Sequence, residues 1–480
     1  MCYNRGERIL KGRRLAMRRA NVEMTQGSIV KNMLLFALPL ALSSILQTMY
    51  NMADMAVVGQ SADGGTAAVA AIGATGVITS IFINIFAGIS VGANVLVAFF
   101  IGARDKKNAS DTVQTALWGS LFLGLLLCGA GFLTAEPFLV LTECPADVYA
   151  DALLYLRVYF AGVPFATVYN FGASVLRARG DSTRPLFFLG ISGLLNVVLN
   201  LIAVLGLGWG VAGVSAATSA ANLASAVMVA VTLIRDKNEY TKFDPRRFFI
   251  DFRKILRILG VGVPVALSSL LYCISNLQIQ SAVNSFGSAT MAGNSAAGNL
   301  EGYTAAFNGA FGSAVLSFAS QNRGAGNLGR VKKSVLWGCV LGGAVSGGLG
   351  VCLWLLRYPL LGLILGSGLE GDPSYLSTAL EVGAMRASFL LLAYAMPPIS
   401  NALGSGMRGL GYSLTPTLVS VFGVCGWRAF WMFAIYPLDP TMFNIYLCYT
   451  ISWSLVMVFS FFFWLFTYRR YAKKHPPAAA

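Results

Sequence analysis

The residues PLALSSIL at positions 39–46 return as PVALSSLL at positions 264–271, which is 225 positions later. A longer pattern, R-x-x-G-x-S-x-x-P, also occurs twice. It reads RARGDSTRP at 177–185 and RGLGYSLTP at 408–416, an offset of 231. Two repeats in the same order, at similar offsets, predict a chain built from two related halves.

A third repeat supports this division. LWG occurs at 117–119 and again at 336–338. Between the halves, residues 235–254 read RDKNEYTKFDPRRFFIDFRK, a polar stretch in an otherwise apolar chain. We therefore expect a linker there.

Composition indicates where the chain resides. Of its 480 residues, 56% are hydrophobic and only 11% are charged, whereas a soluble domain carries about 25% charged residues. This excludes a soluble globular enzyme, a disordered chain and a coiled coil. A receptor with one membrane anchor is excluded as well, because no polar stretch is long enough for an external domain. The composition predicts a helical protein that crosses a membrane many times.

About 20 apolar residues form one membrane-spanning helix, and the chain offers twelve such segments. They are 31–58, 67–101, 112–135, 150–173, 185–206, 210–234, 255–280, 289–320, 333–356, 376–406, 412–436 and 441–467. The predicted fold is all-α, with two pseudo-symmetric six-helix lobes around a central cavity. The longest connections are the linker 235–254 and the outer loop 357–375.

Lysine and arginine mark the side of the membrane on which each connection lies. Of the 35 such residues, 31 fall on one side of the twelve-span arrangement, and only Arg357 falls on the other. Arg157, Arg386 and Arg428 lie inside spans. This places both termini in the cytoplasm and explains the net charge of +15 as a topology signal rather than nucleic-acid binding.

The predicted organisation has five parts. They are a basic tail 1–24, a six-helix lobe 25–234, the linker 235–254, a second six-helix lobe 255–468 and a tail 469–480. We interpret the N-terminal tail as a solvated segment, or as translation from upstream of a natural start at Met24, rather than as a lipid-binding or signal segment.

Motifs of soluble enzymes are absent or out of context. G-x-S-x-G at Gly88–Gly92 lies in an apolar helix without a preceding strand, and no Gly-Lys pair exists for a nucleotide-binding P-loop. The only histidine, His475, lies in the tail, and among the eight cysteines only Cys2 and Cys144 lie clearly outside apolar runs, on opposite sides of the membrane. We therefore expect no enzyme activity, metal site, cofactor or structural disulfide.

Two carboxylates lie deep within spans, Asp54 in the first and Glu301 in the eighth. A charge within a span is costly and is a functional candidate by default. Such a group can take up and release a proton, and once ionised it can bind Na+. Asn276 and Gln280 lie four residues apart and form a polar stripe on span 7. Together with Glu301 they make up a second predicted polar site.

Prolines occupy matching places in the two halves. Pro39 and Pro264 open the first repeated motif, in spans 1 and 7. A proline inside a helix removes a backbone hydrogen bond and can form a hinge. We predict hinges at both, and similar effects of Pro164 and of the pair Pro397–Pro398 in spans 4 and 10.

Paired six-helix halves, DMAVVG at 54–59, YLR at 155–157 and LRARGDSTRP at 176–185 together resemble the multidrug and toxic compound extrusion (MATE) family. The resemblance covers residues 25–468. It implies twelve helices in two lobes that rock between inward-open and outward-open states. It also implies export of organic cations and drugs, driven by inward flow of H+ or Na+.

The resemblance further implies a cation site in the N-terminal lobe. Many members place an Asp in span 1, an N-x-x-x-D pair in span 5 and a Thr in span 6. The matching residues here are Asp54, Asn196 and Thr218, but Asn200 stands where the pair has its Asp. Because one carboxylate remains where the family has two, we favour H+ over Na+ as the coupling ion.

The predicted function is therefore cation-coupled antiport of small organic, cationic substrates across a bacterial inner membrane by a monomer. One alternative is a flippase of the same superfamily that moves lipids or oligosaccharide-lipids, for which the three arginines in spans would suit an anionic headgroup. An alternative of another class is a channel or a non-transporting receptor, although neither requires paired halves with matched hinges.

Overall fold

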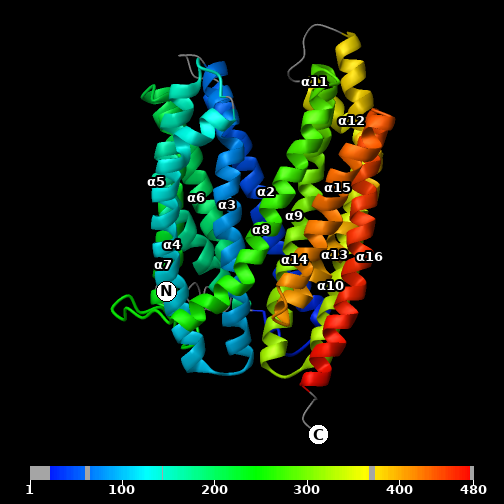
Figure 1. Cartoon of the computed structure of the whole chain (residues 1–480). Helices are drawn as coiled ribbons and strands as arrows, with labels where there is room; N and C mark the ends of the chain where they lie inside the picture. Colours follow the sequence, from blue (N-terminus) through cyan, green and yellow to red (C-terminus); the bar gives the residue numbers. More distant parts are fainter. Residues whose placement is uncertain (1–21, 60–64, 143, 367–372, 476–480) are drawn as a thin grey trace, which may run out of the picture. The chain divides into compact units, whose positions relative to one another are not determined.

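A computed structural model describes residues 22–59, 65–142, 144–366 and 373–475. Most of the predicted N-terminal tail and the last five residues lie outside this part of the chain. Every regular element within it is a helix, as Figure 1 shows. The elements of the first half are α2 (Ile29–Gly59), α3 (Gly65–Gly102), α4 (Lys106–Leu141), α5 (Tyr149–Ala178), α6 (Thr183–Asn200), the π-helix η1 (Leu201–Gly206) and α7 (Gly210–Ile234).

The second half repeats this order with more interruptions. Its elements are α8 (Phe252–Asn284), α9 (Ser288–Gly324), α10 (Leu328–Leu355), α11 (Arg357–Gly366), α12 (Pro373–Ala393), α13 (Met396–Gly409), α14 (Leu414–Ser420), η2 (Val421–Gly426), α15 (Trp427–Phe430), η3 (Trp431–Ile435), η4 (Tyr436–Leu438) and α16 (Met442–Lys474).

The twelve predicted spans are confirmed as helices. Eleven of the described segments are long and apolar enough to cross a membrane, some of them made of several consecutive elements. The twelfth, α9, has 37 residues but is rich in Gly, Ala, Ser and Asn, so its hydropathy is lower. The predicted outer loop 357–375 contains a helix, because α11 occupies its first ten residues.

The chain forms two compact units. One, here called the N lobe, contains the described residues up to Gly27 and within Leu42–Ala266; the other, here called the C lobe, contains Ser28–Ala41 and the described residues from Leu267 onwards. Helices α2 and α8 therefore each pass from one lobe into the other. The linker 235–254 belongs to the N lobe, where Arg179 pairs with Asp236, Lys106 with Glu239, and Asp111 with both Arg247 and Lys254.

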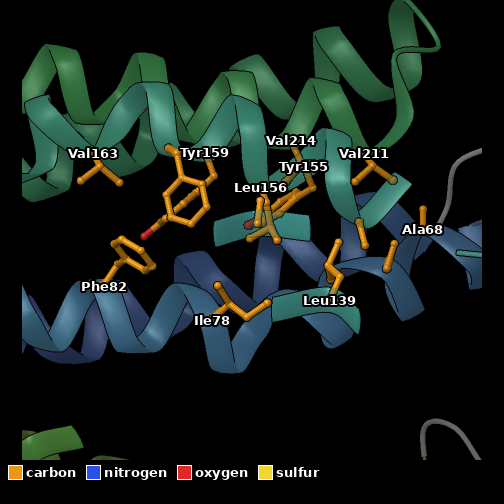
Figure 2. Close-up of a cluster of buried hydrophobic side chains, with 14 of the residues drawn as sticks. Ala68, Ile78, Phe82, Leu139, Tyr155, Leu156, Tyr159, Val163, Val211 and Val214 are labelled. Carbon is orange, nitrogen blue, oxygen red and sulfur yellow. The ribbon is translucent and has the colours of Figure 1, made fainter. Parts of the chain in front are cut away.

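Within the N lobe, α5 packs against α3, α4 and α7. Figure 2 shows the apolar cluster at this junction, with Phe82 on α3 and Tyr159 on α5 among its labelled side chains. The rings of Phe82 and Phe160 lie with their centroids 4.6 Å apart. Glycines let α3 approach α8 closely, since a Cβ on Gly88 would lie 2.6 Å from the Ala266 Cα. The G-x-S-x-G at this place therefore serves helix packing.

Both copies of R-x-x-G-x-S-x-x-P fold into the same turn. Gly180 has a φ of +99° and Gly411 a φ of +88°, a region that L side chains rarely adopt. Each glycine follows the end of one helix and precedes the start of the next. The sequence repeat therefore corresponds to a repeat of backbone structure.

Candidate functional site

A continuous hydrogen-bond network joins the four residues predicted as the cation site of the N lobe. Asn200 Nδ2 donates to Asp54 Oδ1 at 2.5 Å and to Asn196 Oδ1 at 3.4 Å. Asn196 Nδ2 in turn donates to Thr218 Oγ1 at 3.3 Å. The network thus links α2, α6 and α7, whose polar residues lie up to 164 positions apart in the sequence.

Close contact between α2 and α6 sets the position of Asp54. One turn before Asp54, Tyr50 donates its hydroxyl to Gly190 O at 3.2 Å, and its ring lies against Gly193. A Cβ on Gly193 would lie 1.9 Å from this ring, so only glycine permits the contact. Because Asp54 follows Tyr50 by one helical turn, it reaches Asn200 on the same side of α6.

The network lies at the end of regular α-helix in α6. Asn200 is its last residue, and the π-helix η1 starts at Leu201. Such π segments are rare and are frequent at functional sites. They widen the helix and displace the side chains of that turn, so the segment adjoins the point at which Asn200 meets Asp54.

Apolar side chains border this network. Val58, Val204 and Val214 belong to the same apolar cluster, of which Figure 2 labels Val214, and each lies one helical turn from a member of the network. Asn200 is fully buried and Asn196 is 5% exposed. The amides of Asn196 and Asn200 therefore interact in a setting of low dielectric constant, where hydrogen bonds are stronger than in water.

Asp54 has no positively charged partner in the described part of the chain. Its one hydrogen bond comes from a neutral amide. A carboxylate within a membrane span is costly and is normally paired with a compensating charge. The arrangement therefore suits a group that is compensated by a bound cation or proton.

The second predicted site differs in this respect. Glu301 of α9 forms a two-point ion pair with Arg386 of α12, with distances of 2.7 Å to Nε and 3.0 Å to Nη2. Arg386 Nη1 also donates to Asn294 Oδ1 at 2.7 Å, and Asn294 donates to Gln280 at 3.4 Å. Glu301 and Gln280 therefore share one network, but the Glu301 charge is balanced by the arginine.

Asn276, the third predicted member, contacts a different group. Its Oδ1 accepts a 2.8 Å hydrogen bond from Nη1 of Arg428, which is fully buried. The Tyr449 ring connects the two parts, since its centroid lies 4.3 Å from the Arg428 Cζ and 5.9 Å from the Arg386 Cζ. The sequence placed both arginines inside spans without assigning them to this site; the signal available was a charge within an apolar run.

The predicted hinge prolines lie inside continuous helices, Pro39 in α2 and Pro264 in α8. In α2 the C-lobe part ends at Ala41, two residues after Pro39. In α8 the N-lobe part ends at Ala266, two residues after Pro264. The pair Pro397–Pro398 follows a break in the tenth span, where α12 ends at Ala393 and α13 begins at Met396.

Comparison with known proteins gives consistent results. The MatE family model matches residues 39–202 and 264–430. The chain is 27% identical over 408 residues to the probable multidrug resistance protein YoeA of Bacillus subtilis. This alignment covers 84% of the chain and 86% of YoeA. It is 28% identical to the probable multidrug resistance protein YpnP of the same organism, over 64% of this chain and 68% of YpnP.

Solved structures share the fold. A crystal structure of a MATE in complex with MaL6 superposes with a TM-score of 0.84 at 21% identity, over 94% of this chain and 99% of the other. The outward-facing conformation of a multidrug resistance transporter from the same family gives a TM-score of 0.83 at 20% identity, with the same coverage.

Proposed function

The chain belongs to the MatE family of multidrug efflux transporters, and on this premise we propose that it exports small organic cations in exchange for protons. The observation that carries the proposal is the Asp54 network. It places one uncompensated carboxylate among neutral polar side chains within the N lobe. A proton or another monovalent cation bound there neutralises the site, and its release on the other side of the membrane restores the charge.

The hydrogen bonds around Asp54 favour the proton over Na+. Asn200 presents its amide N–H to the carboxylate, whereas its Oδ1 is buried and has no hydrogen-bond partner in the described residues. Hard metal cations take several oxygen ligands. Because the amide of Asn200 faces Asp54 as a donor, it supports the carboxylate without offering an oxygen beside it.

A direct test compares the two gradients. Purified protein in liposomes is loaded with a fluorescent cation, and efflux is measured under an imposed H+ or Na+ gradient. We expect the proton gradient to drive efflux and the Na+ gradient to have no effect at fixed pH. Strong Na+ dependence without a response to the proton gradient would overturn the choice of ion.

A variant sharpens this test. Asn200→Asp restores the second carboxylate of the family pattern, so we expect it to gain Na+-dependent efflux. Asn170→Asp is the matched control, because it adds a carboxylate to the same lobe on α5, where Asn170 bonds to the Ala166 carbonyl. A gain of Na+ dependence in both variants would show that added charge, rather than the site, is responsible.

We also propose that the protein acts as a monomer in the inner membrane, with both termini in the cytoplasm. The distribution of lysine and arginine supports this orientation. Cys144, between α4 and α5, is then external. A membrane-impermeant thiol reagent should label it in intact cells, and a cysteine placed at Lys107 only after permeabilisation; the reverse pattern would invert the topology.

A further inference from the structure

Arg428 is a buried charge that the proton-coupling site does not use. It lies in the eleventh span, on α15, and its exposed fraction is 0%. None of the ion pairs in the described part of the chain includes it, whereas the neighbouring Arg386 has Glu301 as a partner. A buried ion is normally paired, so the absence of a counter-ion calls for an explanation.

The neighbours of Arg428 are neutral. Its Nη1 donates to Asn276 Oδ1 at 2.8 Å, and its Nε donates to Ser452 Oγ at 3.3 Å. The Nη2 group is buried and has no hydrogen-bond partner in the described residues. A guanidinium has five N–H groups arranged to bind both oxygens of a carboxylate or phosphate, and here one nitrogen remains available.

Two tyrosines flank the guanidinium. The Tyr449 ring lies 4.3 Å from Cζ and the Tyr272 ring 5.2 Å from it. Tyr449 is buried, but Tyr272 is 40% exposed, so one of its sides contacts Arg428 and another faces the outside of the C lobe. Cation–π contacts stabilise the charge without neutralising it. Displacement of the Tyr272 ring would uncover the guanidinium.

The charges of this cluster also favour an anion. Glu301 contributes one negative charge, and Arg386 and Arg428 contribute two positive charges. The cluster therefore carries one net positive charge within the membrane-spanning part of the C lobe. A single oxyanion would balance it.

We propose that Arg428 and Asn276 form a binding site for an oxyanion, the carboxylate or phosphate group of a molecule that the protein transports or of a bound lipid, and that Tyr272 covers this site when it is empty. The role in transport rests on the proposed function. The site extends the accepted substrates from plain cations to molecules that also bear an acidic group.

The test is equilibrium binding to the purified full chain in neutral detergent, followed by fluorescence polarisation. Rhodamine B bears a free carboxylate, whereas in its methyl ester this group is an uncharged ester. We expect Arg428→Gln to weaken rhodamine B binding at least tenfold and ester binding less than twofold, with Arg428→Lys in between. Arg157→Gln, which removes an exposed arginine of the N lobe paired with Glu136, should change neither.

Tyr272→Ala provides a second variant if Arg428→Gln fails to fold. Removal of the covering ring should strengthen binding of rhodamine B relative to its ester. Competition separates the two sources of the oxyanion: inorganic phosphate displacing the dye indicates a soluble anion, and phosphatidylglycerol displacing it where phosphatidylcholine does not indicates a lipid headgroup. Either result supports the site.

The proposal is overturned if the acid and the ester bind alike in the natural protein and in every variant that folds. No gradient is present in this experiment. Its outcome is therefore independent of whether protons drive transport, and a failure of the proposed antiport would be seen only in the efflux measurement.

Discussion

The two lobes share a helix order but carry opposite charges in their polar clusters. In the N lobe, Asp54 accepts a hydrogen bond from the neutral amide of Asn200, which also bonds to Asn196. In the C lobe, Glu301 is paired with Arg386, and Arg428 adds a further positive charge. Duplication has thus preserved the scaffold, including the matched turns at Gly180 and Gly411, while the chemistry of each half has diverged.

The repeat offsets show where the divergence occurred. At the offset of 231, Asn196 and Asn200 correspond to Trp427 and Trp431, and at the offset of 225 Asp54 corresponds to the buried Ile279. The C lobe therefore lacks the N-lobe site at the equivalent positions. Its charges come instead from Glu301 in span 8, Arg386 in span 10 and Arg428, which directly follows Trp427.

The largest expected effect is the loss of transport when the carboxylate of the N lobe is removed. Asp54→Asn removes the only charge of the N-lobe network, so gradient-driven efflux should fall at least about a hundredfold, or about 2.7 kcal/mol. Substrate binding should remain within about twofold. The control is Asp151→Asn, an exposed carboxylate in the first turn of α5. Normal transport by the Asp54 variant would contradict a coupling role for the N-lobe carboxylate.

The second effect concerns stability in the C lobe. Glu301→Gln leaves the guanidinium of Arg386, whose side chain is only 13% exposed, without a counter-ion, which should cost about 3 kcal/mol of unfolding free energy. Thermal unfolding in detergent measures it, and the double variant with Arg386→Gln should recover part of the loss. Glu136→Gln, which breaks an exposed pair, should cost less than about 1 kcal/mol. If Glu301→Gln and Glu136→Gln lower the free energy of unfolding equally, the Glu301–Arg386 pair is no more buried than the exposed pair.

A third effect tests how the N-lobe site is positioned. Gly193→Ala would force the Tyr50 ring to move and should destabilise the protein by about 1–2 kcal/mol, with transport reduced as Asp54 shifts. Gly190→Ala, one turn away, meets nothing within 4 Å and should be neutral. If both variants transport normally, the α2–α6 contact does not position Asp54.

The smallest effect concerns a feature that the two halves share. Pro39→Ala and Pro264→Ala should each slow transport about threefold by stiffening a helix that passes between the lobes, and should leave stability unchanged or raised. Pro137→Ala, inside α4 but within the N lobe alone, should not slow it. A slower rate in the Pro137 variant as well would argue against hinges at the crossing points.

Much of the N-lobe site could be predicted from the sequence. Polar residues stand out in apolar spans, and the motif at 54–59 fixes the place of Asp54 in the resemblance. Asn196 and Asn200 lie four positions apart, so a helix presents them on one face. These are local regularities, and the structure brings all four predicted residues together.

The partners in the C lobe could not be predicted in this way. Glu301 and Arg386 lie 85 positions apart on different helices. The hydropathy of a span does not predict how the neighbouring helix is rotated about its axis or shifted along it. Helix α11 was missed because its ten residues are far fewer than a membrane span requires. The passage of α2 and α8 between the lobes likewise depends on tertiary packing.

The most direct measurement of the central claim is infrared difference spectroscopy of the purified full chain between two pH values. Protonation of a carboxylate produces a carbonyl stretching band of its own. If Asp54 exchanges the coupling proton while Glu301 stays in its ion pair, this band is lost in Asp54→Asn and retained in Glu301→Gln. A band that survives in Asp54→Asn and disappears in Glu301→Gln would contradict the account and move the coupling site to the C lobe.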